Sequence, residues 1–181
     1  NESGQLGDGM TEIGYDNYRN IPKCISDINE SDLKGKKITS IPYSSDIVIA
    51  LDEEGKIYTW GSNERGQLGD GIIEIGYGNY RNIPMCVNDI EGNILEGKRV
   101  VDIIYIELDG KVVVLDNQGK IYTWGDGELI KCVSDSSDEN NVLYNKEINI
   151  ILSIDRDLKE FYYYADNEGN LYYQFIQRNP V

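Results

Sequence analysis

The sequence predicts an all-β fold made of repeated antiparallel sheets, and three observations lead to that fold class. Segment 1–28 returns as 63–90 at a constant offset of 62 residues, with 21 of 28 positions identical. The block Gly-Lys-Ile-Tyr-Thr-Trp-Gly at 55–61 returns at 119–125. Within each unit the apolar residues alternate with a period of two, as in strands. A fixed period of this length is typical of repeat architectures, in which one unit cannot bury its apolar face alone.

A third, degenerate copy completes the chain. Gly-Asn-Leu-Tyr-Tyr at 169–173 is a faded form of the block at 119–123, and the Gly-Gln-Leu-Gly-Asp-Gly loop is missing between 125 and 129. Residues 1–181 therefore form one repeat array with units at approximately 1–61, 62–125 and 126–181. The last unit resembles a terminal, capping repeat.

Each unit is expected to contain four short strands. The first strand is predicted at 37–43, 99–105 and 147–153, and the second at 46–51, 111–115 and 160–164. The third is predicted at 56–60, 120–124 and 170–175, and the fourth at 22–28, 84–90 and 129–134. Four-stranded units joined by Gly-rich turns, with no convincing helix, are typical of β-propeller blades.

Acidic turns join the second and third strands at 52–55, 116–119 and 166–169, and each ends in a glycine. A calcium site is one interpretation of such turns. The spacing lacks the ligand set of an EF-hand, and ordinary turn chemistry accounts for Asp and Gly at these positions. We therefore predict structural turns here and no metal site.

The order of these motifs resembles the regulator of chromosome condensation repeat family. The resemblance rests on an Asp-x-x-Gly turn, Ile-Tyr-Thr-Trp-Gly, Asn-Glu-x-Gly-Gln-Leu-Gly-Asp-Gly and Ile-Pro-x-Cys, and it covers essentially the whole chain. It implies a ring of about seven blades. The chain departs from the family pattern before the second strand, where Pro-Tyr-Ser-Ser at 42–45 replaces the usual Gly and His.

Three units are too few to close a propeller, which needs about four to eight blades. The third unit also ends on its third strand, so the first and last units are expected to have open edges that attract further strands. The chain is interpreted either as the C-terminal part of a longer propeller or as one of two or more copies that associate to close a ring. The start at Asn1, without an initiator Met, favours the first interpretation.

The charge of the chain argues against a nucleic-acid partner. The formal net charge is −15, whereas neutralising phosphates requires clusters of Lys and Arg. We therefore do not extend to this chain the chromatin binding that the resemblance implies. No run approaches the ~18 apolar residues of a membrane span. The Asn-, Ile-, Lys-, Asp- and Tyr-rich composition suggests an AT-rich, bacterial genome.

The three cysteines occupy one register of the repeat. Cys24, Cys86 and Cys132 each fall in a predicted fourth strand, so they are expected to lie too far apart for a disulfide or a shared metal site. Three free thiols favour a reducing, cytoplasmic compartment, and secretion stays open.

Catalysis is not predicted. The chain has no His, so Ser-His and Cys-His pairs and HExxH zinc sites are excluded. The Gly-Gln-Leu-Gly-Asp-Gly loop lacks the Lys-Ser/Thr of a phosphate loop, and no cofactor is expected. Trp60 and Trp124 recur at one register and are interpreted as packing anchors between blades.

The candidate partner-binding residues lie in a loop that the repeat preserves. Tyr and Arg dominate interface hot spots, and a structural need for the same loop packing explains the repeat equally well. The candidates are Tyr15, Tyr18, Arg19, Tyr77, Tyr80 and Arg81.

The sequence thus favours a non-catalytic protein–protein interaction module whose partner is a protein. The resemblance implies a first alternative, a guanine-nucleotide exchange factor for a small GTPase. It also implies a second, a secreted enzyme inhibitor or surface protein, because some bacterial propellers of this type block enzymes such as β-lactamases.

Overall fold

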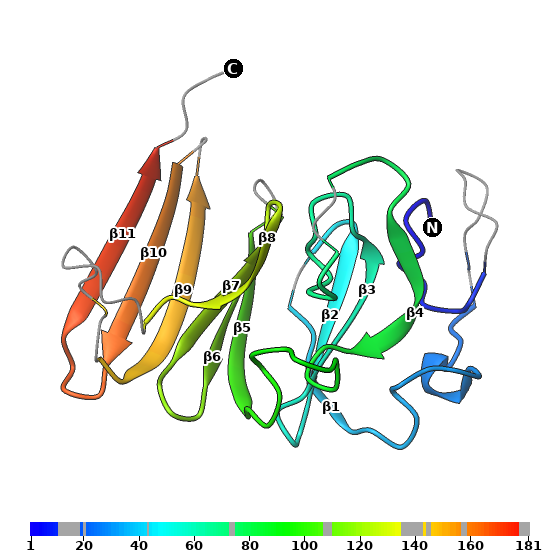
Figure 1. The fold of residues 1–181 in the computed structure, drawn as a ribbon, viewed down its shortest axis with the longest axis horizontal. Coiled ribbons are helices and arrows are strands. Elements are labelled where there is room, and N and C mark those ends of the chain that lie inside the picture. The colour runs from blue at the N-terminus through cyan, green and yellow to red at the C-terminus, as the bar shows by residue number, and fades with distance from the viewer. Residues whose placement is uncertain are drawn as a thin grey trace.

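The fold consists of three antiparallel sheets that follow one another along the chain (Figure 1). The computed structural model describes residues 1–10, 19, 21–42, 44–72, 75–106, 110–134, 143, 146–156 and 159–177. Within these residues, the segment before the first sheet contains a 3₁₀ turn, η1, at Ile25–Asp27, and the rest of the regular structure is strand.

The first sheet has the order β1-β2-β3-β4, with strands Ile38–Ser40, Ile47–Asp52, Ile57–Ser62 and Tyr80–Cys86. The second has the order β5-β6-β7-β8, with strands Val100–Ile106, Lys111–Asp116, Ile121–Gly125 and Glu128–Cys132. In the third, β10 at Lys159–Asp166 lies between β9 at Ile148–Arg156 and β11 at Leu171–Gln177. The predicted all-β class is confirmed, and the third sheet stops at its third strand as expected.

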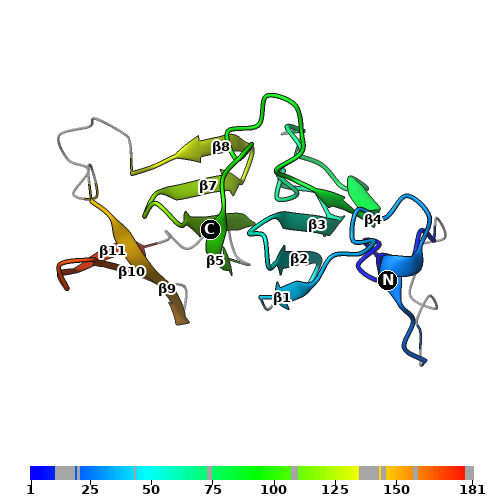
Figure 2. The same cartoon turned by 90° about the horizontal axis from the view of Figure 1, so that it is seen from below.

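Apolar side chains on both faces of the central sheet hold the three sheets together. One cluster joins the first and second sheets, and Ile49 and Ile57 of one sheet contribute to it with Val114 and Trp124 of the other. A second cluster joins the second and third sheets through Leu115, Ile121, Ile151 and Tyr164. Because strand residues alternate between faces, a near-continuous apolar strand is what a sheet covered on both sides requires. Seen from below, the sheets lie side by side as separate layers (Figure 2).

A repeated Asp–Tyr hydrogen bond locks the hairpin in each sheet. In the second sheet, Asp116 accepts the backbone N–H groups of Gln118 and Lys120 at 2.9 and 2.8 Å, and the hydroxyl of Tyr122 donates to its other oxygen at 3.0 Å. The same arrangement recurs for Asp52 with Tyr58 and for Asp166 with Tyr172, each at 2.9 Å. The carboxylates of these turns are thus engaged within their own hairpins.

The fourth strands differ most from the sequence prediction. The strand expected at 22–28 is wrong: residues 25–27 form η1, and residues 21–24 lie outside every described sheet with Cys24 exposed. β4 hydrogen-bonds to β3, whereas residues 21–24 pair with no strand among the described residues. The strand expected at 84–90 begins at Tyr80 and ends at Cys86, because residues 87–90 turn towards the next sheet.

Other sequence expectations agree with the structure. All three cysteines are free thiols, as predicted; Cys86 is buried and Cys132 half-buried. Trp60 and Trp124 are 3% and 0% exposed, which confirms them as packing anchors. No helix in the described part of the chain has the length and apolar character needed to cross a bilayer.

Candidate functional site

The two Gly-Gln-Leu-Gly-Asp-Gly loops join the first and second sheets to the segments that precede them. The loop at 66–71 leaves β3 and packs on Trp124 of the second sheet, whose indole Nε1 donates to the Gln67 carbonyl at 2.9 Å. A Cβ atom on Gly69 would lie 2.8 Å from that nitrogen. The first copy repeats the contact, with Trp60 Nε1 donating to the Gln5 carbonyl at 2.8 Å. Gly7 and Gly69 are therefore required by close approach to an indole.

The two described arginines of the candidate set close these loops. Arg81 donates from Nη2 to Asp70 at 2.6 Å, and Arg19 makes the equivalent bond to Asp8 at 2.9 Å. Burial lowers the pKa of the Arg81 guanidinium, and the charge of Asp70 opposes this shift. The Nη1 atom of Arg81 is buried with no hydrogen-bond partner in the described residues. Such a pair fixes geometry at a desolvation cost, which supports a positioning role for these side chains.

The two described tyrosines of the set point to solvent. Tyr77 is 97% exposed in the turn before β4, and Tyr80, the first residue of β4, is 41% exposed. Ile72 and Ile75 in the same connection are 51% and 67% exposed. Large apolar side chains are therefore exposed along a connection closed by the Arg81–Asp70 pair. Tyr15 and Tyr18 lie outside the described residues.

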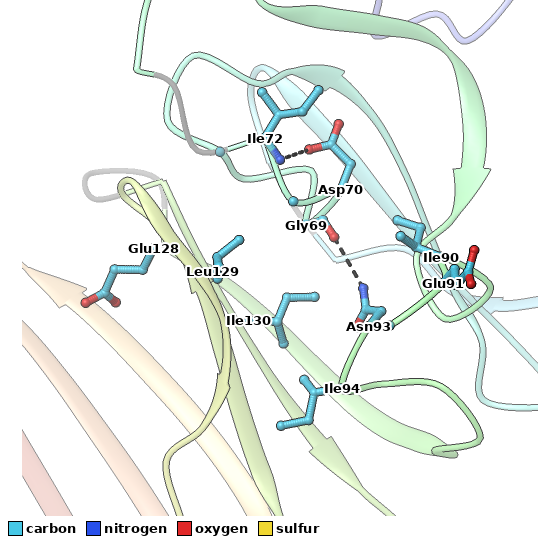
Figure 3. Close-up of a pocket in the computed structure, with 13 residues that line it drawn as sticks. Gly69, Asp70, Ile72, Ile90, Glu91, Asn93, Ile94, Glu128, Leu129 and Ile130 are labelled. Atoms are coloured by element: carbon cyan, nitrogen blue, oxygen red, sulfur yellow. Dashed lines mark hydrogen bonds between the residues drawn. The ribbon is translucent and has the colours of Figure 1, made fainter.

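A groove runs beside this connection, between β8 and the loops that join the first two sheets (Figure 3). Its volume is about 280 Å³. Figure 3 shows Leu129 and Ile130 of β8 on one side and Ile94 on the other, with Ile72 near one end. Three carboxylates, Asp70, Glu91 and Glu128, belong to its lining, which contains no Lys or Arg.

Sequence reasoning missed this groove and the Asp–Tyr bonds. The recurring spacing of six residues between Asp and Tyr signals the bonds, because one turn and two paired strand residues separate them. The groove results from substitutions between repeats and could be found only by comparing copies position by position. The described residues contain no cluster of three or more metal-ligating side chains.

Comparison with protein families identifies the repeat. Models of the regulator of chromosome condensation (RCC1) repeat match residues 54–105 and 38–67. The human E3 ubiquitin-protein ligase HERC2 is 31% identical over 137 residues, which are 76% of this chain and 2% of HERC2. The serine/threonine-protein kinase Nek9 of Xenopus laevis is 31% identical over 130 residues, covering 70% of this chain and 13% of Nek9.

Solved structures of the same architecture agree. Human WBSCR16 superposes with a TM-score of 0.53 at 17% identity, over 79% of this chain and 35% of its own. Prp20p of Saccharomyces cerevisiae gives 0.52 at 21% identity, over 75% of this chain and 32% of its own. These likenesses establish the fold, and the chain spans about a third or less of each protein.

Proposed function

The chain belongs to the RCC1 repeat family, and from that premise we propose that it is a non-catalytic protein-interaction module. Two copies of the loop are held in place by a tryptophan contact and an Arg–Asp pair each. Binding surfaces on such a scaffold lose little conformational entropy when a partner docks.

The observation that carries the proposal is the exposure of Tyr77 at the surface of a loop closed by a partly buried ion pair. A tyrosine that is 97% exposed contributes nothing to its own blade, yet both copies of the loop contain it. Tyr77 and Tyr80 supply apolar area and a hydroxyl each, and Ile75 adds an apolar neighbour. Aromatic side chains of this kind dominate the binding energy of protein interfaces.

Charge favours a basic partner. The net charge of −15 attracts positively charged proteins over long range and raises their association rate. The published structure of Prp20p is described with its binding to Gsp1p and histones, and a second structure shows yeast RCC1 bound to Kap60. Basic histones are therefore a reasonable first partner class to test with this chain.

Nucleotide exchange on a small GTPase is the second candidate, and membership of the RCC1 repeat family supports it. It is tested by release of a fluorescent guanine nucleotide from a small GTPase with and without the chain. We expect no acceleration, because the described residues contain no segment inserted into the repeat that could act as a wedge. Inhibition of a secreted enzyme remains a third proposal.

The open third sheet supports association with further repeats. Leu171 on β11 is 69% exposed, whereas Ile57 and Ile121, at the same position of the repeat, are fully buried against the next sheet. Tyr173, two residues further along β11, is 72% exposed. A second copy of the chain or further blades of a longer protein would cover this face. Sedimentation over a range of concentrations distinguishes a self-associating chain from a stable monomer.

The experiment that tests the proposed function compares partner capture by the wild type with that by Tyr77→Ala and Tyr80→Ala. Each substitution is expected to weaken binding of core histones by more than about 1 kcal/mol and to leave stability within about 1 kcal/mol. Tyr173→Ala, which removes an exposed tyrosine from another sheet, is the matched control. Equal binding by all four proteins would reject the tyrosine surface.

A further inference from the structure

The first sheet protects the outer edge of its fourth strand. Gly9 N–H donates to the carbonyl of Asn82 at 3.0 Å, and Asp32 N–H donates to that of Pro84 at 3.3 Å. The Cys86 N–H donates to the Asp32 carboxylate at 2.8 Å. Pro84 itself has no N–H to offer at this edge. These bonds and the proline follow the means by which natural proteins block an edge strand.

The equivalent edge of the second sheet, the outer edge of β8, lacks these contacts among the described residues. By the repeat, β8 corresponds to β4, because Cys132 pairs with Tyr122 as Cys86 pairs with Tyr58. Ile130 then replaces Pro84 and adds an N–H, and Ile94 replaces Asp32 and removes the carboxylate. A Cβ atom on Gly9 would lie 3.8 Å from Ile83, whereas one on Gly71 would meet nothing within 4 Å. The groove of about 280 Å³ lies where these contacts are absent.

The backbone of β8 presents hydrogen-bonding groups to this groove. Val133 N–H donates to the Ile121 carbonyl at 2.9 Å, so the backbone groups of residues 131 and 133 point towards β7. In an antiparallel pair, the groups of the alternate residues Ile130 and Cys132 then point away from β7. Among the described residues, no backbone hydrogen bond across the groove reaches these two, in contrast to the first sheet.

We propose that this groove binds an extended peptide segment of a protein partner, which adds as a fifth strand to the outer edge of β8. Main-chain bonds to Ile130 and Cys132 would supply affinity, as in other cases of strand addition. Ile90, Ile94 and Ile130 line an apolar floor for alternate side chains. The groove is small and open, so it suits side chains of a bound strand better than an enclosed small molecule.

Charge determines the rest of the ligand. Glu91 is exposed at the rim. Asp70 and Glu128 also belong to the lining, but Asp70 is paired with Arg81, and Glu128 with Lys111 and Lys131. The exposed Glu91 and the net charge of −15 therefore favour lysine or arginine between the apolar positions of the ligand. The occupant is a segment that alternates aliphatic and basic residues. This inference rests on the proposed function only in that the ligand is a protein chain, and it does not depend on Tyr77 or Tyr80.

The test uses the peptide acetyl-Lys-Val-Lys-Val-Lys-amide and amide chemical shifts of the ¹⁵N-labelled chain. We expect shifts concentrated at residues 128–132 and 90–94. Methylation of both valine nitrogens keeps the charge and the side chains and removes two donors, so it should weaken binding at least tenfold. A Glu-Val-Glu-Val-Glu analogue should not bind.

The decisive variant is Ile94→Asp, which restores the carboxylate that caps the first sheet. Ile94 is 44% exposed, so the fold should tolerate the change. The variant adds negative charge, which alone would strengthen binding of the lysine peptide; capping Cys132 N–H should instead weaken it at least tenfold. Ile41→Asp, at an isoleucine that is 62% exposed and directly follows β1, is the charge-matched control and should keep full binding.

Two results would overturn the proposal. One is an absence of shifts at 128–132 at millimolar peptide. The other is an Ile94→Asp variant that binds the peptide as well as Ile41→Asp does. Because these assays need no partner of the tyrosine surface, their failure would leave the capture experiment with Tyr77→Ala unaffected.

Discussion

Replacing Gly69 with alanine tests the contact that joins the first two sheets. Gly69 has a φ of +71°, and its new Cβ would lie 2.8 Å from Nε1 and 3.0 Å from Cε2 of Trp124. The obstacle is a rigid indole that is 0% exposed, so it cannot move without disturbing the core. The substitution should therefore break the bond from Trp124 to the Gln67 carbonyl.

The expected cost has two parts. A non-glycine residue in the left-handed region costs about 1–2 kcal/mol. Leaving the buried indole N–H and the carbonyl unpaired adds about 1–3 kcal/mol. Gly69→Ala should thus lower the free energy of unfolding by about 2–5 kcal/mol, measured by urea denaturation with Trp fluorescence and circular dichroism.

The chain contains its own control. Gly71 has a similar φ of +84°, but a Cβ there would meet nothing within 4 Å. Gly71→Ala therefore measures the backbone strain alone, about 1–2 kcal/mol. If the two substitutions cost the same, Trp124 does not fasten the loop to the second sheet and the account of how the sheets are joined is wrong.

Four further results are expected. Asp116→Ala should lower the free energy of unfolding, measured in urea, by about 2–4 kcal/mol, because two turn N–H groups and the Tyr122 hydroxyl lose their acceptor. Glu53→Ala, at an exposed residue, should change it by less than about 0.5 kcal/mol. Hydrogen bonds from Asn170, its side chain first, lower the pKa of Asp166 to about 2. A carboxyl whose pKa is lower in the folded state stabilises the fold above its unfolded pKa near 3.9, and this contribution should fade as the pH falls from about 4 to about 2. A titration midpoint of Asp166 near 4, measured by carbon-detected NMR, would contradict this expectation. In the native chain, a thiol reagent should react with Cys24 at once and slowly with Cys86, because Cys86 is buried and burial raises its pKa to about 11. Titration of the denatured, unreduced chain should detect three thiols. If the chain self-associates through the open third sheet, Leu171→Asp should shift sedimentation towards the monomer, and an unchanged profile would place the contact elsewhere.

Much of the fold could be predicted from the sequence, because the repeated units can be compared with one another. The second and third strands were predictable within about two residues at their ends, because the Asp-x-x-Gly turn between them fixes where each hairpin reverses. Cys24, Cys86 and Cys132 were correctly interpreted as free thiols. The third sheet was expected to end on its third strand, and it does.

The fourth strands were less predictable because pairing, and not local pattern, decides them. Residues 22–24 and 84–86 share Pro-x-Cys, yet among the described residues only the second segment pairs with a third strand and belongs to β4. Identical local chemistry therefore gave a strand in one copy and an exposed segment in the other.

The candidate site was predictable only in outline. The repeated loop indicates the candidate Tyr and Arg residues. The sequence alone does not show that the arginines are bonded to Asp8 and Asp70 while Tyr77 is exposed. The open edge of β8 depends on the absence of contacts present in the first sheet. Such an absence becomes visible only when both copies are seen folded.

Photo-cross-linking from position 77 tests the proposed interaction surface most directly. A benzoylphenylalanine at 77, introduced into the whole chain, is irradiated with core histones, and the products are mapped by mass spectrometry. We expect cross-links from position 77 and none from the same group at 173, on the third sheet. Cross-links from 173 alone, or equal yields from both positions, would contradict a partner surface at the tyrosine loop.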